Sequence, residues 1–305
     1  MHVADLRPGT IPGMMAWQMR MEGFMLFRFL DKGDEEATGA PAGTEHHSGR
    51  DLSATRGVGI RIEKINKYFG SNHVLKDLDL EILPGETFSI IGPSGTGKSV
   101  LLKLIVRLDR PDSGQIYIDD RPLFAGDGTS ADADWFRCSM VFQSSALFNS
   151  LTVGENVGLW HRDKRICPEK TIRRIVAEKL ALVGLEGKEG LRTSELSGGM
   201  KKRVAIARSL AMNPDLILYD EPTAELDPVN ADELANTIVG LRKTVKNTTV
   251  IVTHDLNFAL YLSDRIAMIH EGSIIEIGTP AALKASTNPV VRNFIYTTTK
   301  GIKES

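Results

Sequence analysis

Residues 92–99 have the types and the spacing of a phosphate-binding loop. They read Gly-Pro-Ser-Gly-Thr-Gly-Lys-Ser and fit the pattern G-x-x-x-x-G-K-[ST] in full. Glycines let the backbone curl so that several N–H groups point at one phosphate, and the helix that follows adds the positive end of its dipole. Lys98 is expected to reach the β- and γ-phosphates of a nucleotide, and Ser99 to bind Mg²⁺. The loop therefore predicts a nucleotide-binding protein.

A second chemical feature is the acidic pair Asp220 and Glu221, which follows four apolar residues at 216–219. A buried parallel strand delivers its ligand site at its carboxyl end. Asp220 is expected to hold Mg²⁺ through water, and Glu221 to polarise an attacking water as general base. An acidic pair alone is more typical of a turn, so the interpretation depends on the phosphate-binding loop.

The composition is that of an ordinary globular protein, with 42% hydrophobic and 25% charged residues in a chain of 305. A net charge of −2 gives no electrostatic support for a nucleic-acid partner. Only two cysteines occur, Cys138 and Cys167, so disulfide frameworks and zinc sites are not expected. No apolar run reaches the ~18–20 residues of a membrane-spanning helix, so any membrane role must come from docking.

The elements that position these residues begin at Gly59, where strand-like and helical runs start to alternate. This order predicts an α/β fold with a parallel sheet covered on both faces. Between Phe142 and Asn213 helical runs replace the strands, which predicts an inserted helical subdomain over about residues 144–213. The expected strands cover residues 60–65, 87–91, 115–118, 139–142, 216–219, 248–252 and 265–269, and the main helices cover 100–105, 169–183 and 201–212.

Residues 1–58 differ in composition from the rest of the chain. A methionine-rich opening is followed by a stretch rich in Gly, Ala, Asp, Glu and Ser, whose composition is typical of disorder. We expect a weakly ordered leader here. An amphipathic segment that binds a membrane surface is the alternative.

Between the two chemical features, residues 196–200 read Leu-Ser-Gly-Gly-Met, which resembles the signature sequence of ABC-type ATPases. The resemblance covers residues 60–278 in order. Phe69 matches the aromatic residue that stacks on adenine, Gln143 the glutamine loop and His254 the switch histidine. Residues 224–227 match the loop after the carboxylates, and Asp227 belongs to this dimer loop. Glu225 departs from the family, which usually has Gly at this position.

The resemblance implies a P-loop NTPase (RecA-like) core with an antiparallel β edge, and hydrolysis of ATP with Mg²⁺ as cofactor. It implies that Glu221, His254 and Gln143 are catalytic. Ser99, Gln143 and Asp220 would bind the metal, Asp220 through water. The implied ATP-binding residues are Phe69, Gly92, Pro93, Ser94, Gly95, Thr96, Gly97, Lys98, Ser99 and Val100.

In the family, the signature binds the γ-phosphate held by the opposite subunit. Ser197, Gly198 and Gly199 precede a helical run, so their N–H groups and the helix dipole can bind an anion. A chain with one copy of each motif must pair to complete two sites, most simply as a homodimer. The resemblance thus implies a second ATPase subunit as partner, and an integral membrane permease on which the Gln143 loop and a helical stretch at 144–150 dock.

Three stretches resemble the Mla-type intermembrane phospholipid transport ATPases and their chloroplast-envelope relatives. They are residues 142–157, the run Met200-Lys201-Lys202 where many importers have Gln-Arg-Gln, and the tail 286–294. The expected domains are accordingly 59–280 for the ATP-binding domain and 281–305 for a C-terminal extension that contacts the second subunit through Val290, Val291 and Phe294.

The expected function is therefore ATP-driven phospholipid transport, with a lipid-binding substrate protein as further partner. The expected location is the cytoplasmic face of the inner (plasma) membrane, and the alternative is the stromal face of the chloroplast inner envelope. Two other functions stay open, namely the ATPase of a solute importer such as one for polar amino acids, and a soluble non-transport ABC ATPase. Lipid identity, transport direction and the permease are not specified by the sequence.

Overall fold

The computed structural model describes residues 56–124 and 135–300, so nearly all of the predicted leader lies outside the described residues. Its last residues belong to the folded domain. Val58 is fully buried, and its carbonyl accepts a hydrogen bond from the Thr248 hydroxyl at 2.7 Å. Val58, the last residue of the expected leader, therefore packs with the ATP-binding domain.

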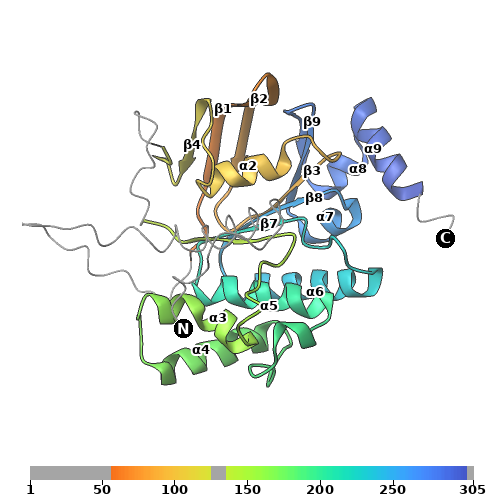
Figure 1. The fold of residues 1–305 in the computed structure, drawn as a ribbon. Helices are drawn as coiled ribbons and strands as arrows, with labels where there is room; N and C mark the ends of the chain where they lie inside the picture. The colour runs from red at the N-terminus through yellow and green to blue at the C-terminus, as the bar shows by residue number, and fades with distance from the viewer. Residues whose placement is uncertain (1–55, 125–134, 301–305) are drawn as a thin grey trace, which may run out of the picture. The chain divides into compact units, whose positions relative to one another are not determined.

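A six-stranded sheet forms the centre of the domain (Figure 1). Its strand order is β10-β9-β3-β8-β7-β6, and only the edge strand β10 runs antiparallel to its neighbour. The strands are β3 (Thr87–Ile91), β6 (Cys138–Val141), β7 (Leu216–Asp220), β8 (Thr248–Thr253), β9 (Arg265–His270) and β10 (Ser273–Gly278).

Both faces of this sheet are buried, as the near-continuous apolar strands require. Side chains alternate between the faces along each strand. In β7, Leu216 and Leu218 join one core cluster, whereas Ile217 and Tyr219 join another. The first cluster also contains the helix α2 (Lys98–Ile105), and the second contains the helices inserted after β6.

A second, four-stranded antiparallel sheet packs over α2 in the first cluster. Its order is β2-β1-β4-β5, formed by β1 (Ile60–Phe69), β2 (Asn72–Ile82), β4 (Ser113–Ile118) and β5 (Arg121–Pro122). Strands β2, β5 and β10 were not predicted from the sequence. This sheet supplies the antiparallel part of the expected fold.

Three helices lie between β6 and β7, on the face of the central sheet opposite α2 (Figure 1). They are α3 (Val153–Asp163), α4 (Glu169–Leu182) and α5 (Gly198–Ala211). Thr152 and Glu155 form a capping box that fixes the start of α3. Residues 144–150 are not helical, contrary to expectation, because α3 begins only after this box.

The rest of the domain is α6 (Pro228–Thr244), α7 (Leu256–Leu262), α8 (Pro280–Lys284) and α9 (Pro289–Lys300). Val291 of α9 is fully buried against the chain's own core, and Phe294 packs on the same cluster. Only Val290 of the three tail residues is exposed, at 36%. Val291 and Phe294 thus pack on the chain's own core, and a contact of this tail with a second subunit stays a prediction.

The α/β fold with inserted helices and an antiparallel β part is confirmed. Within residues 56–124 and 135–300, no helix is long and apolar enough to cross a membrane.

Candidate functional site

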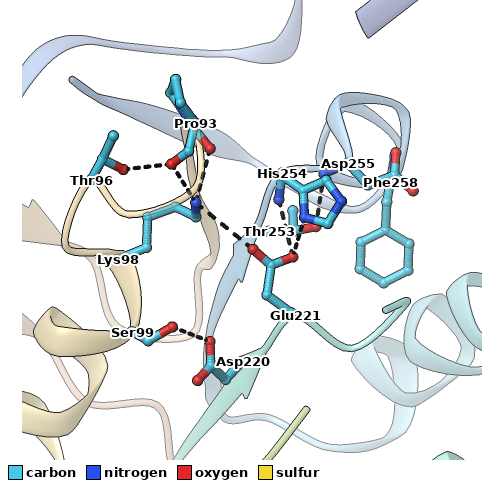
Figure 2. A network of polar contacts seen from close by, with 11 residues as sticks. Pro93, Thr96, Lys98, Ser99, Asp220, Glu221, Thr253, His254, Asp255 and Phe258 are labelled. Atoms are coloured by element: carbon cyan, nitrogen blue, oxygen red, sulfur yellow. Dashed lines mark hydrogen bonds and ion pairs between the residues drawn. The ribbon is translucent and has the colours of Figure 1, made fainter. Parts of the chain in front are cut away.

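The phosphate-binding loop and both carboxylates meet at the carboxyl ends of three adjacent parallel strands (Figure 2). The loop follows β3, Asp220 ends β7 with Glu221 directly after it, and His254 follows β8. In this type of sheet, ligands bind at this edge.

Two glycines of the loop are fixed by backbone geometry. Gly92 has φ +154°, and a Cβ there would stand 2.3 Å from the Ile269 carbonyl oxygen. Gly97 has φ +100° at the start of α2, and a Cβ there would stand 2.6 Å from a methyl of Leu75. Larger residues at either position would push the loop away from its neighbours. The loop therefore keeps its curl because two of its residues lack a side chain.

Lys98 is 5% exposed and lies under the loop. Its Nζ donates to the carbonyls of Gly92 at 2.9 Å and Pro93 at 3.0 Å, and lies 3.8 Å from Glu221 Oε1. Burial lowers the pKa of this ammonium, while the carboxylates of Glu221 and Asp220 oppose that shift. These contacts fix the Lys98 ammonium beside the loop backbone, where the phosphates of a nucleotide would bind.

Ser99 and Asp220 face each other at the same edge. The Ser99 hydroxyl donates to Asp220 Oδ1 at 2.8 Å. Burial raises the pKa of Asp220, the Ser99 hydrogen bond opposes this shift, and the Glu221 carboxylate adds to it. Hydroxyl and carboxylate oxygens are ligands that suit Mg²⁺, and a cation would offset the cost of burying Asp220. The described residues hold no group of three or more His, Cys, Asp or Glu side chains that could hold a metal ion.

Glu221 and His254 form a direct pair (Figure 2). Glu221 Oε2 lies 2.8 Å from His254 Nδ1 and accepts the His254 backbone N–H at 3.2 Å. The Glu221 side chain is 13% exposed, whereas that of His254 is 59% exposed. Glu221 has a left-handed backbone, φ +47°, and its N–H donates to the Val252 carbonyl at 2.8 Å. One end of the Glu221 carboxylate therefore meets a histidine and the other a lysine.

The structure does not join every expected residue to this cluster. The Gln143 side chain is exposed in the loop after β6, and no hydrogen bond among the described residues links it to Ser99 or Asp220. Phe69 ends β1 with its ring 51% exposed, and the Lys67 ammonium lies 5.3 Å from the ring centroid. Both side chains are accessible to a nucleotide.

The expected signature residues lie apart from the phosphate-binding loop, at the start of α5. The Ser197 hydroxyl caps α5 by accepting the Met200 N–H at 3.2 Å. A Cβ on Gly199 would stand 2.5 Å from Asn230 Oδ1, which explains a glycine there. Asp227 caps α6 by accepting the Asn230 N–H at 3.1 Å. No hydrogen bond or ion pair among the described residues joins the signature to the phosphate-binding loop.

Two cations of α5 were not identified from the sequence. Lys202 and Arg208 are 4% and 8% exposed, and both donate to backbone carbonyls of the Gln143 loop. The available signal was Arg208 itself, a charge inside the apolar run 204–211, since a buried charge needs partners.

Comparison with known proteins identifies the family of the chain. A family model described as ABC transporter matches residues 75–224. The protein TRIGALACTOSYLDIACYLGLYCEROL 3 (chloroplastic) of Arabidopsis thaliana is 39% identical over 80% of this chain and 75% of its own length. The L-cystine import ATP-binding protein TcyN of Bacillus subtilis (strain 168) is 41% identical over 72% of this chain and 86% of its own length.

Among solved structures, the chain is similar to a dimeric post-hydrolysis state of the ATP-binding cassette MJ0796 bound to ADP and Pi. The TM-score is 0.63 with 33% identity, over 72% of this chain and 98% of that one. The predicted family, fold and ATPase activity are confirmed by these relatives. The chain belongs to the ABC transporter family, as an ATP-binding subunit that hydrolyses ATP.

Proposed function

We propose that this ATPase drives phospholipid transport through a separate membrane permease, with hydrolysis at the cluster around Glu221. The observation that carries the catalytic part is the meeting of Lys98, Ser99, Asp220, Glu221 and His254 at one sheet edge. The lipid part rests on the resemblances in the chain and on one relative.

In the proposed reaction, the loop N–H groups and Lys98 bind the β- and γ-phosphates. Lys98 exchanges the carbonyls of Gly92 and Pro93 for phosphate oxygens, which are better partners for a buried ammonium. Glu221 accepts the proton of the attacking water, and His254 holds the Glu221 carboxylate and reaches the γ-phosphate. Gln143 orients the water from the neighbouring loop.

Mg²⁺ fits the oxygen donors of Ser99 and Asp220, and Gln143 adds a further oxygen in the proposed set. When bound, the ion neutralises charge on the phosphate oxygens. The protein's part is to hold these oxygens beside Lys98.

Support for a lipid substrate comes from a relative named for trigalactosyldiacylglycerol, a galactolipid. The resemblance of the Met200-Lys201-Lys202 run and of the tail to phospholipid transport ATPases supports the same substrate class. On this proposal the partners are a second copy of the chain, the permease and a lipid-binding substrate protein. The chain acts peripherally on the cytoplasmic face of the plasma membrane, or on the stromal face of the chloroplast inner envelope.

Import of a polar amino acid is the second candidate. It is favoured by one observation, the 41% identity to an L-cystine import ATP-binding protein. Hydrolysis at the cluster around Glu221 would power either transport, so this cluster does not distinguish the two substrates.

Co-purification from native membranes, with mass spectrometry of proteins and lipids, tests the substrate. We expect recovery of a permease and a lipid-binding protein with bound phospholipid. The matched control is a Lys98→Ala chain, which keeps the docking surface and loses nucleotide binding. Recovery with an amino-acid-binding protein instead would contradict the lipid proposal and leave the catalytic part intact.

A further inference from the structure

The loop that follows β6 is held from one side by two cations of helix α5. Lys202 Nζ donates to the Gln143 carbonyl. Arg208 donates through Nη1 to the Ala146 carbonyl at 2.7 Å and through Nη2 to the Ser145 carbonyl at 3.2 Å. Three carbonyls within four residues of this loop thus accept from a single helix.

The backbone of this loop requires such support. Ser145 and Ala146 have φ +63° and +46°, in the left-handed region. This conformation costs roughly 1–2 kcal/mol per residue and persists only where neighbouring groups impose it. Arg208 is 8% exposed and fixes both carbonyls, so it imposes the turn. Arg208 thus holds the Ser145–Ala146 end of the loop, and Lys202 holds its Gln143 end.

Lys202 also faces the acidic residues of the catalytic edge. It is 4% exposed. Burial lowers its pKa, while the carboxylates of Glu225, Asp220 and Glu221 oppose that shift. The Lys202 ammonium thus combines one direct hydrogen bond, to the Gln143 carbonyl, with longer-range attraction to these carboxylates.

We propose that Lys202 is a positioning residue for Gln143 and ties the signature helix to the Gln143 loop of its own chain. The inference rests on the proposed function, in which Gln143 orients the attacking water. The helix that carries Lys202 begins at Ser197–Gly199, the residues proposed to meet the partner's ATP. A shift of α5 on that contact would therefore move the Gln143 backbone through Lys202.

Glutamine and arginine at position 202 test which property of the lysine side chain matters. A glutamine keeps an N–H donor but loses the charge and the length of the lysine side chain. An arginine keeps charge, length and donors. The two substitutions therefore separate the need for a charged long donor from the need for any donor.

The test is ATP turnover of the full-length chain, with kcat, KM and ATP affinity measured separately and thermal unfolding as a check on folding. Lys202→Met should lower kcat by about ten- to a hundredfold, because a small misplacement of a catalytic group costs that much. ATP affinity should stay near the parental value, since Lys98 and Phe69 are untouched. Lys202→Arg should restore most of the lost kcat, and Lys202→Gln only part of it.

Two further variants make the result specific. Lys243→Met removes an exposed lysine from α6 and should leave kcat unchanged. Gln143→Ala should lower kcat, and adding Lys202→Met to it should lower kcat no further, because residues that act through one another are not additive.

The outcomes separate the inference from the proposed function. A parental kcat for Lys202→Met beside a slow Gln143→Ala would overturn the inference alone. Effects that multiply in the double variant would overturn it too, since Lys202 would then act independently of Gln143. A parental kcat for Gln143→Ala would overturn the proposed role of Gln143 and the inference with it.

Discussion

At the scale of single residues, the site depends on pairs more than on isolated groups. Glu221 is held between His254 and Lys98, and Ser99 is held by Asp220. The sequence indicated every member of these pairs, because each belongs to a motif with fixed spacing. It did not indicate the pairing of Glu221 with His254, which lie 33 positions apart and meet only because β7 and β8 are neighbours.

Phe69 gives a prediction about nucleotide affinity. Its exposed ring ends β1, and base stacking on an aromatic ring contributes roughly 1–3 kcal/mol. Phe69→Ala should therefore raise the Kd for ATP by about five- to 150-fold and leave kcat nearly unchanged. Tyr68→Ala is the control, because the Tyr68 ring already stacks on His73 at a centroid distance of 4.0 Å. Equal losses of affinity in both variants would contradict the stacking role.

The two cysteines give a prediction about thiol reactivity. Burial raises the pKa of Cys138 to about 12, so at pH 8 its folded-state thiol stays protonated. Cys167 is half-buried and lines an open hollow between α3 and α4. Iodoacetamide should modify one thiol per folded chain at pH 8, and two after denaturation restores the ordinary pKa of Cys138. Mass spectrometry counts the products, and rapid double modification of folded protein would contradict the burial of Cys138.

At the scale of elements, the sequence predicted every parallel strand of the central sheet and missed β2, β5 and β10. The strand at Thr87–Ile91 was predicted to the residue, because all five of its residues are buried. In β2 buried Leu78, Leu80 and Ile82 alternate with acidic residues, which strands disfavour. The alternation itself was the available signal.

The C-terminal helix α9 supplies a test of where the tail packs. Val291 is fully buried in its own chain, whereas its neighbour Val290 is 36% exposed. Val291→Ala removes two buried methyl groups and should lower the free energy of unfolding by about 2 kcal/mol. Val290→Ala should change it by less than about 0.5 kcal/mol. Urea unfolding at low protein concentration measures both free energies. A larger loss in Val290→Ala than in Val291→Ala would contradict the packing of Val291 in its own chain.

At the scale of the whole molecule, one chain contains both parts of the proposed ATP site, the phosphate-binding loop and the signature, at separate places. The signature at the start of α5 lies beside Leu226 and Asn230, and within residues 56–124 and 135–300 no hydrogen bond or ion pair joins it to the phosphate-binding loop. A similar cassette is dimeric with ADP and Pi bound. One copy of each motif in the sequence predicted that two chains must pair. The position of the second chain could not be predicted, because it depends on contacts between two folded subunits.

Pairing predicts a nucleotide-dependent change in size. Glu221→Gln with ATP should elute as a dimer in size-exclusion chromatography, because ATP stays bound between the chains. Adding Ser197→Arg should return it to a monomer by blocking the signature, while ATP still binds each chain. A dimer that persists in the double variant would show that another surface joins the subunits.

The most direct test of the account is the steady-state ATP turnover of Glu221→Gln, measured with its ATP affinity. The substitution keeps the size of the side chain and removes the basic carboxylate, so ATP should bind as in the parental chain. Because a general base contributes about 10²- to 10⁴-fold, kcat should fall by that factor. Turnover at the parental rate would contradict the assignment of Glu221 as the base, and with it the proposed mechanism.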